Sequence, residues 1–352
     1  METKIVTIEK ADAPERINEK LEQAGACIKR GGLVAFPTET VYGLGGDALN
    51  PESSRKIYAA KGRPSDNPLI VHIADIEHLD SIVSEIPESA RKLADAFWPG
   101  PLTMIFQKSE LVPYQTTGGL DTVAVRMPSH PLAKRFIEKA GGYVAAPSAN
   151  LSGKPSPTTA KYVMQDMMGR IDMIIDGDDA QIGLESTIVD VTGDVPMILR
   201  PGYITQEMLS KVVGETDMDV TIFDSSSTQA PKAPGMKYRH YAPKGELVII
   251  EGESADVVRY INEQTSLHAQ KGERTGVIGT QELISKYHAD SIKNAGSKDD
   301  PLAVARQLYT FLREFDDENI AFMYAESFED KGIGQAIMNR LLKAAGHKVI
   351  QV

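Results

Sequence analysis

Short apolar runs rich in β-branched residues recur along residues 1–213, and stretches with helical spacing separate them. Among these runs are GLVAF, LIVHI, LTMIF, TVAVRM and STIVDV. Strands that are apolar on both faces and alternate with helices are typical of α/β domains with a buried sheet. Residues 1–213 are therefore predicted to form one α/β domain.

One helix, which ends just inside the segment KGRPSDNPL, has both of its ends marked by the sequence. Asn50 is suited to cap its N-terminus, Pro51 to occupy the first helical position and Gly62 to end it. Lys61 and Arg63 then leave from its C-terminal end, where cations also complement the helix dipole.

From about residue 214 to residue 245 the periodic pattern gives way to a stretch rich in Ser, Pro and Gly, which is typical of a linker. The second half of 214–245, PGMKYRHYAP, is too basic and aromatic for a mere spacer, so an ordered linker is predicted. Residues 246–352 then alternate apolar runs with helical stretches at 257–267, 301–315 and 333–345. This alternation predicts a smaller, Rossmann-like α/β domain.

Composition narrows the class of protein. A chain of 352 residues favours two domains. The 38 Lys and Arg against 49 Asp and Glu give a net charge of −11, which disfavours a broad nonspecific grip on nucleic acid or on an acidic membrane. Cys27, the one cysteine, is expected to be a packed thiol in a reducing compartment. No apolar run approaches the roughly 18 residues of a membrane span, so a cytoplasmic enzyme or binding protein is expected.

Several well-known motifs are absent from the sequence. There is no GxxxxGK[ST], no complete GxGxxG after a strand, no HExxH, no paired CxxC and no GxSxG. The seven histidines lack the spacing of a metal site. The glycine-rich stretches GLGG at 43–46 and GIG at 332–334 are expected to form turns or helix starts.

Polar residues gather where the predicted strands end, and each is suited either to a structural role or to binding a ligand. Thr38 belongs either to a turn whose hydroxyls bond the backbone or to a ligand site. Lys61 and Arg63 are either solvated or aimed at an anion. His72 is either a hydrogen-bonded core histidine or a ligand-binding one. Arg126 lies on a strand that is predicted to be central, so it needs an internal carboxylate or a ligand as partner, because an unpaired buried charge costs several kcal/mol.

Three further segments carry polar residues at strand ends. The loop in VAAPSANLSGKPSPT holds Ser148, Asn150 and Ser156, and its hydroxyls and backbone N–H groups suit an anion. Ser186 opens a strand in GLESTIVDV, and Arg200 closes one in ILRPG. Ligands of open α/β sheets gather outside strand ends, so these segments are predicted to converge on one crevice. Its cations and hydroxyls suit a substrate that carries phosphates and a carboxylate.

Seven segments share their order and spacing with a known family: PTETVYGLGGDAL, KGRPSDNPLIVHI, FWPGPLTMIF, TVAVRMPSHP, APSANLSGKPSPT, GLESTIVDV and ILRPG. In them the chain resembles the YrdC/YwlC family of threonylcarbamoyl-AMP synthases. PGMKYRHYAP followed by a small α/β domain is similar to the longer, two-domain branch of that family. The resemblance covers residues from about 15 to 352. It implies a twisted, mixed open sheet in the first domain, which would bind all substrates.

The resemblance also implies a reaction. L-threonine, bicarbonate and ATP would give threonylcarbamoyl-AMP and pyrophosphate, with Mg²⁺ expected alongside the triphosphate. Separate transferase proteins would then modify tRNAs that read ANN codons, so contact with tRNA itself is expected to be indirect at most. No covalent enzyme intermediate is needed, and catalysis would rest on alignment and on cations aimed at the phosphoryl group.

The resemblance assigns roles to individual residues. The family's tetrad of lysine, arginine, serine and asparagine falls on Lys61, Arg63, Ser148 and Asn150, which are expected to be catalytic. Expected to bind ATP are these four together with Asn67, Thr122, Ser156, Arg200 and Tyr241. Expected to bind L-threonine are Thr38, His72, Arg126, the backbone at Ala146, and Ser186. Arg126 is suited to clamp the threonine carboxylate with two parallel hydrogen bonds.

The linker carries one more prediction. Its residues Tyr238, Arg239, His240 and Tyr241 are expected to fold over the crevice as a lid that protects labile intermediates from water.

Two other functions stay open. One is an enzyme that makes a carbamoyl-adenylate from carbamoyl phosphate, although the relatives that do so add zinc-finger and acylphosphatase segments that are not visible in this sequence. The other is an RNA-binding module with a concave basic surface, against which the net charge weighs.

Overall fold

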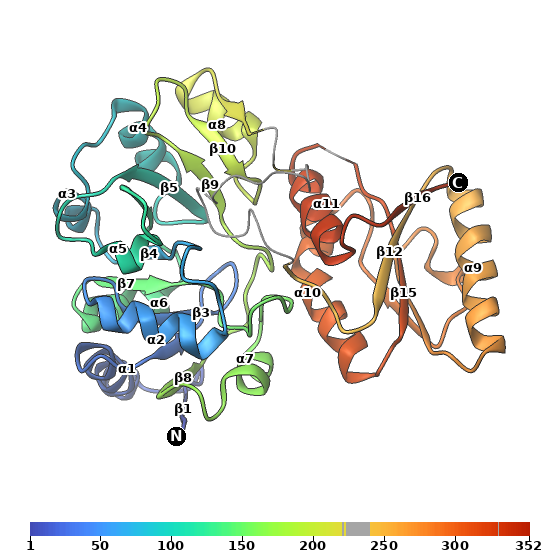
Figure 1. Ribbon diagram of the computed structural model, residues 1–352, viewed down its shortest axis with the longest axis horizontal. Coiled ribbons are helices and arrows are strands. Elements are labelled where there is room, and N and C mark those ends of the chain that lie inside the picture. The colour runs from blue at the N-terminus through green and yellow to red at the C-terminus, as the bar shows by residue number, and fades with distance from the viewer. Residues whose placement is uncertain (220–221, 223–239, 330) are drawn as a thin grey trace. The chain divides into compact units, whose positions relative to one another are not determined.

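The chain folds into two units, each with its own sheet. The computed structural model describes residues 1–219, 222, 240–329 and 331–352 (Figure 1). Residues 1–237 form the first unit, except for 153–155 and 182–184, which belong with 238–352 in the second.

The first unit is built on an 11-stranded sheet with the order β1-β8-β2-β3-β7-β4-β6-β5-β9-β10-β11. Parallel and antiparallel neighbours are mixed: β2 is parallel to β8 but antiparallel to β3. This confirms the predicted mixed, open α/β sheet. The strands are β1 (Lys4–Thr7), β2 (Val34–Phe36), β3 (Gly43–Asp47), β4 (Ile70–Ile73), β5 (Leu102–Gln107), β6 (Thr122–Arg126), β7 (Tyr143–Ala146), β8 (Met173–Asp176), β9 (Thr187–Asp190), β10 (Met197–Arg200) and β11 (Asp217–Met218).

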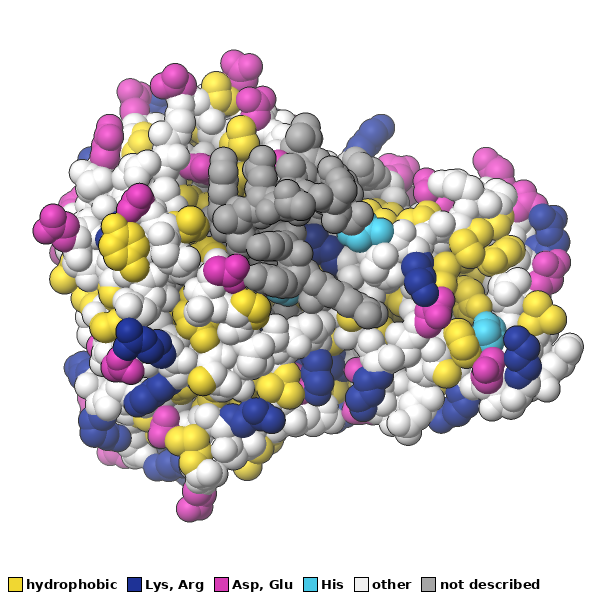
Figure 2. Space-filling model, viewed as in Figure 1, with side chains coloured by type: hydrophobic (Ala, Val, Ile, Leu, Met, Phe, Trp, Pro, Cys, Tyr) yellow, Lys and Arg dark blue, Asp and Glu magenta, His cyan; other side chains and the backbone are white. Residues whose placement is uncertain are grey.

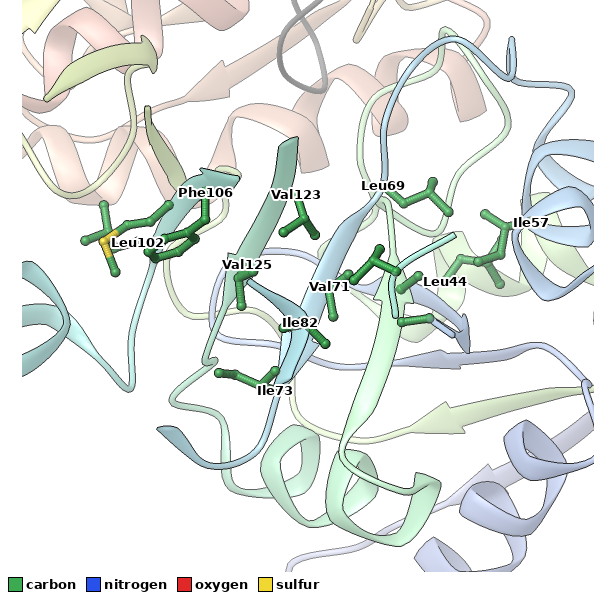
Figure 3. Packing of buried hydrophobic residues seen from close by; sticks show 14 of the residues in the cluster. Leu44, Ile57, Leu69, Val71, Ile73, Ile82, Leu102, Phe106, Val123 and Val125 are labelled. Carbon is green, nitrogen blue, oxygen red and sulfur yellow. The ribbon is translucent and has the colours of Figure 1, made fainter. Parts of the chain in front are cut away.

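Helices cover both faces of this sheet. They are α1 (Pro14–Lys29), α2 (Pro51–Lys61), α3 (Leu79–Ile82), α4 (Glu88–Phe97), α5 (Tyr114–Thr117), α6 (Pro131–Ala140), α7 (Ala160–Met167) and α8 (Gln206–Val213), with a 3₁₀ turn at Ile76–His78. Alternate residues of a strand enter different clusters: Val34 and Phe36 pack with α1 and α6, and Ala35 joins the cluster of α2, α4, α7 and α8. Figure 3 shows part of the second cluster, with Val71 and Val125 on neighbouring strands. Both faces are therefore apolar, as the strand runs predicted.

Two local predictions for this unit are confirmed. The Asn50 side chain accepts a hydrogen bond from the Glu52 N–H at the start of α2, and Gly62 ends the helix in the left-handed region at φ 64°. Gly62 takes this conformation without strain because it has no Cβ. Cys27 is buried in α1, and burial raises the pKa of its thiol. It is the packed thiol that the sequence predicted.

The prediction of a turn or helix start for GLGG is wrong at residues 43–46. These residues form most of β3, which pairs antiparallel with both β2 and β7. A Cβ on Gly45 would lie 2.8 Å from Cγ1 of Val144, and a Cβ on Gly46 would lie 3.0 Å from Cδ1 of Ile57. The glycines thus serve close packing inside a sheet. At residues 332–334 a helix start is confirmed, since Gly332 directly precedes α11 (Ile333–Ala344).

The second unit contains a five-stranded sheet in the order β14-β13-β15-β12-β16, with every pair parallel. Val257 and Ile261 of α9 pack on one face, and Phe315 of α10 lies against Gly276 on the other. This confirms the predicted small Rossmann-like domain. Its elements are β12 (Glu246–Glu251), α9 (Ser254–Gln270), β13 (Thr275–Gly279), a 3₁₀ turn at Ile284–Lys286, β14 (Ser291–Asn294), α10 (Pro301–Asp317), β15 (Phe322–Glu326), α11 and β16 (Val349–Gln351).

The predicted linker, residues 214–245, is described only in part. Its first residues include β11, which pairs with β10 and so extends the first sheet. Tyr238 and Arg239 lie outside the described residues, so the ordered linker and the lid stay predictions.

No helix in the described part of the chain has the length and apolar character needed to cross a membrane.

Candidate functional site

Lys61 joins the end of α2 to the loop that follows β7. Its Nζ donates to the carbonyl oxygens of Ser148 at 2.5 Å and Asn150 at 2.6 Å. The Ser148 hydroxyl in turn donates to Oδ1 of Asn150 at 2.5 Å. Lys61 is only 3% exposed, so it is not a solvated cation at a helix end. The structure therefore brings three of the four predicted tetrad residues into one hydrogen-bonded group.

Arg63, the fourth tetrad residue, closes the KGRPSDNPL loop on itself. Its Nη2 donates to the carbonyl oxygens of Asn67 at 3.3 Å and Pro68 at 3.0 Å. The Asn67 side chain is buried, and its Oδ1 accepts no hydrogen bond from any residue in the described ranges. Because buried polar atoms are nearly always paired, Asn67 fits its predicted place beside a ligand.

Arg126, at the end of β6, has an internal carboxylate as its partner. Its Nη2 lies 2.7 Å from Oε1 of Glu39, in the loop between β2 and β3. Its Nη1 donates to Oγ1 of Thr40 at 2.8 Å, and its Nε donates to the carbonyl of Gly100 at 3.3 Å. The question that the sequence left open is thus answered in favour of an internal partner.

The contact with Glu39 nevertheless leaves Nη2 of Arg126 able to donate a further hydrogen bond. Nη2 is buried and carries two N–H groups, and its 2.7 Å contact with a single carboxylate oxygen can use only one of them. One edge of the guanidinium is therefore held in place while Nη2 keeps its capacity to donate. Arg126 still fits its predicted role as a clamp for a ligand carboxylate.

Glu39 is ionised in this pair. Burial alone would raise the pKa of Glu39, but the Arg126 guanidinium and the backbone N–H of Ser129, 3.2 Å from Oε1, together lower it below its ordinary value. The pair is 5% exposed at Glu39 and 4% at Arg126, so solvent screens the two charges little.

His72 lies beside Arg126, since the two are register partners in β4 and β6. It is buried, and its Nδ1 donates to the carbonyl of Ile70 at 3.1 Å. Burial, and secondarily the charge of Arg126, lowers the pKa of His72 to about 3. The imidazole is therefore neutral at physiological pH and can orient a ligand only as a neutral group.

Thr38 shows the turn geometry that was one of its two readings. Its hydroxyl donates to the carbonyl of Val41 at 2.6 Å and lies 2.9 Å from Oγ1 of Thr40. Thr40 in turn contacts Arg126. The turn thus fixes the loop against Arg126, and a role for Thr38 in binding threonine stays a prediction.

Ser186 and Arg200 form a second group that adjoins Arg126. The Ser186 hydroxyl lies 2.7 Å from Oγ1 of Thr103, and Arg200 donates from Nη2 to Oγ of Ser186 at 3.1 Å and from Nε to its carbonyl at 3.0 Å. Thr103 of β5 is the register partner of Arg126 in β6. Residues predicted for ATP and for threonine therefore meet across adjacent strands.

The other predicted residues occupy strand ends or loops, and one of them belongs to the second unit. Thr122 begins β6, Ala146 ends β7, and the Ser156 hydroxyl donates to Oε1 of Glu185 at 2.5 Å. Tyr241 belongs to the second unit, where its ring centroid is 5.1 Å from that of Tyr309. Its predicted contact with ATP stays a prediction.

Four polar residues around these groups were not predicted as site residues: Glu39, Thr40, Thr103 and Glu185. Glu39 and Thr40 stand in the segment PTETV, and the need of a buried Arg126 for a partner is a signal that could have identified them. Thr103 had no such signal, because its place opposite Arg126 depends on strand register.

No group of three or more His, Cys, Asp or Glu side chains suited to a metal is found among the residues described by the structure.

Comparison with known proteins gives the family. The model of the Sua5, YciO and YrdC proteins, described as "Telomere recombination", matches residues 26–202. This chain belongs to that family. A second model, "Threonylcarbamoyl-AMP synthase, C-terminal domain", matches residues 204–346, so family resemblance covers both units.

Relatives of this Sua5 family member extend over its whole length. A threonylcarbamoyl-AMP synthase of Pyrococcus abyssi is 49% identical and covers 96% of this chain and 98% of its own. One of Bacillus subtilis is 47% identical over 100% of both chains. A solved structure, P. abyssi Sua5 complexed with L-threonine, superposes with a TM-score of 0.93 at 46% identity, covering 99% of this chain and 100% of that one. The two-domain branch recognised from the motifs is confirmed.

Proposed function

We propose that this protein is an L-threonylcarbamoyladenylate synthase, which makes threonylcarbamoyl-AMP and pyrophosphate from L-threonine, bicarbonate and ATP. Its full-length likeness to proteins named threonylcarbamoyl-AMP synthase supports the proposal. The observation that carries it is the Arg126 guanidinium, which is buried, held by Glu39 and Thr40, and left with donor capacity at Nη2. Such a group suits the carboxylate of an amino acid.

The first step forms a carbamate. The free amine of threonine attacks the carbon of bicarbonate, a C–N bond forms, and water leaves, so that R–NH₂ and HCO₃⁻ give R–NH–COO⁻ and H₂O. Arg126 would hold the threonine carboxylate, with neutral His72, Thr38, Ser186 and the backbone at Ala146 around it. The contribution of the protein is to fix the amine beside bicarbonate, which removes the entropy cost of their encounter.

The second step transfers the adenylyl group. A carbamate oxygen attacks the α-phosphorus of ATP, the bond to the bridging oxygen breaks, and pyrophosphate leaves with its electron pair. No residue has to act as a nucleophile. Cations stabilise the charge that develops on the phosphoryl oxygens. The ATP contacts in this proposal are Lys61, Arg63, Asn67, Thr122, Ser148, Asn150, Ser156, Arg200 and Tyr241.

Lys61 has a double part in this scheme. Its ammonium is bonded to the carbonyls of Ser148 and Asn150, so it holds in place the loop whose hydroxyl and amide would face the phosphates. Mg²⁺ would arrive with ATP, held by phosphate oxygens and water, as is common for that ion.

The chemical nature of the product indicates which proteins would act after this enzyme. A mixed anhydride of a carbamate and a phosphate is labile, so downstream threonylcarbamoyl transferase proteins would receive it and modify tRNA in the cytoplasm. The face shown in Figure 2 carries acidic as well as basic side chains, and the net charge of −11 disfavours a broad, nonspecific grip on RNA.

A labelling experiment tests the proposal. The protein is incubated with MgATP, L-threonine and ¹³C-bicarbonate, and the nucleotide product is analysed by mass spectrometry. We expect threonylcarbamoyl-AMP that carries one heavy carbon, and none from Arg126→Met. Product formed from unlabelled carbamoyl phosphate in place of bicarbonate would instead identify the carbamoyl-adenylate reaction. Salt-dependent tRNA binding without any nucleotide product would favour the RNA-binding alternative.

A further inference from the structure

Glu39 uses only one of its two carboxylate oxygens. Oε1 lies 2.7 Å from Nη2 of Arg126 and accepts the backbone N–H of Ser129 at 3.2 Å. Oε2 is buried and accepts no hydrogen bond from the residues that the structure describes. A buried, charged oxygen left unpaired is rare in folded proteins because it destabilises the fold, so it calls for an explanation such as a functional role.

The unpaired oxygen of Glu39 stands next to a donor that has one N–H group left. Nη2 of Arg126 is buried and carries two N–H groups, and its 2.7 Å contact with Oε1 can use only one of them. A ligand that offers an acceptor to Nη2 and, a few atoms away, a donor to Oε2 would satisfy both at once. An amino acid with a carboxylate and a nearby N–H or O–H group has this pattern.

We propose that Oε2 of Glu39 accepts the hydrogen of the β-hydroxyl of threonine, which makes Glu39 a specificity-determining residue. The inference rests on the proposed function. It adds a residue to the threonine pocket and assigns the hydroxyl, the group that distinguishes threonine from an unsubstituted aliphatic side chain, to a charged acceptor.

The hydroxyl is favoured over the amine because of the chemistry that follows. A charge-assisted hydrogen bond is worth about tenfold to 150-fold in an equilibrium. If Glu39 made this bond to the amine, it would hold the amine as ammonium. The fraction of free amine, the form that must attack bicarbonate, would then fall by about the same factor. It would also place a carboxylate beside the newly formed carbamate anion. The hydroxyl stays neutral throughout the reaction, so the same bond there does not oppose catalysis.

Neighbouring acceptors are weaker candidates. The Thr38 hydroxyl already donates to Val41, and it is neutral. His72 is neutral and uses Nδ1 on Ile70. His130 is also buried, with an Nδ1 that has no hydrogen-bond partner in the described ranges, but a neutral imidazole nitrogen accepts more weakly than a carboxylate. Glu39 is therefore the strongest acceptor in this group.

The test compares two substrates that differ only in the hydroxyl, L-threonine and L-2-aminobutyrate. The ratio of their kcat/KM values is measured by pyrophosphate release at saturating MgATP and bicarbonate, for the native protein and for Glu39→Gln. Weakening of Arg126 affects both substrates alike and cancels in the ratio, because both carry the same carboxylate. We expect the preference for threonine to fall at least tenfold in Glu39→Gln.

Two controls keep the result decisive. Glu326→Gln, which changes another buried glutamate in the second unit, should leave the ratio unchanged. If Glu39→Gln does not fold, Glu39→Asp is measured instead: it keeps a charge near Arg126 but draws the carboxylate back, and the ratio should fall there too.

Other outcomes overturn the inference. An unchanged ratio with both substrates equally weakened would mean that Glu39 acts only by holding Arg126. An unchanged ratio together with a shift in the pH dependence of kcat/KM for both substrates would assign Oε2 to the amine. If the native protein releases no pyrophosphate with threonine and bicarbonate, the proposed function itself fails, which is a separate result.

Discussion

Removing Arg126 should destabilise the first unit through Glu39, and the size of the effect can be worked out. In Arg126→Met the Glu39 carboxylate stays buried at 5% exposure and loses the charge that lowers its pKa. Burial then raises that pKa, and the group takes up a proton on folding. The folded group is taken to be protonated at pH 7, and its unfolded pKa is about 4.3. The difference of about 2.7 pH units, at about 1.36 kcal/mol per unit, lowers the free energy of unfolding by about 4 kcal/mol. This agrees with the roughly 3–5 kcal/mol typical of broken buried pairs.

The sign of the pH dependence gives a second check. The folded variant binds a proton that the unfolded chain releases above pH 4.3, so its stability falls as pH rises. The deficit should therefore shrink from about 4 kcal/mol at pH 7 to about 1 kcal/mol at pH 5. The matched reference is the double variant Arg126→Met with Glu39→Gln, which has no carboxylate to protonate and shares every other change.

Urea unfolding followed by the fluorescence of Trp98 measures this difference. Trp98 is the one tryptophan of the chain, and it is buried in the first unit, so its signal reports on that unit. A single variant as stable as the double variant at pH 7, or a deficit that does not change between pH 7 and pH 5, would refute the reasoning about Glu39.

Three further predictions concern stability and the loop after β7. Burial and the charge of Arg126 keep His72 from binding the proton that an unfolded histidine binds below about pH 6.5. Between pH 7 and pH 5 the native protein should therefore lose about 2 kcal/mol more free energy of unfolding than His72→Gln. Equal losses in urea titrations would contradict this. Gly45→Ala should lower the free energy of unfolding by about 1–3 kcal/mol, because its Cβ would meet Val144, and adding Val144→Ala should restore part of that loss. A thermal midpoint equal to that of the native protein would rule out the clash. Lys61→Met should remove the two hydrogen bonds from Nζ to loop carbonyls and so speed hydrogen exchange in the loop after β7, while Lys56→Met, on the exposed side of α2, should not. The same exchange rates in both variants would show that Lys61 does not hold the loop.

The parts of the fold that were predictable depend on local signals. The ends of α2 follow from Asn50, Pro51 and Gly62, whose effects act within one turn of helix. The buried strands follow from their apolar runs. The strand β3 was missed because glycine favours turns in general. Only the close approach of Val144 and Ile57, which depends on how β7 and α2 pack against β3, explains glycine in this strand.

The site was predictable where the burial of a single charged residue requires a partner of opposite charge. A buried Arg126 demands a partner, but whether Glu39 or a ligand supplies it depends on how the loop between β2 and β3 folds back onto β6. The link from Arg126 to Ser186 through Thr103 depends on strand register, which one sequence does not determine. Similarly, Lys61 was expected to face phosphates, and its bonds to loop carbonyls became visible only in three dimensions.

In the proposed reaction, this protein joins threonine and bicarbonate to the adenylyl group of ATP. The most direct test is pyrophosphate release from MgATP with each of the twenty amino acids, with and without bicarbonate. We expect rapid release only when L-threonine and bicarbonate are both present. Release that is independent of bicarbonate, or that is equally fast with an amino acid lacking a hydroxyl, would contradict it.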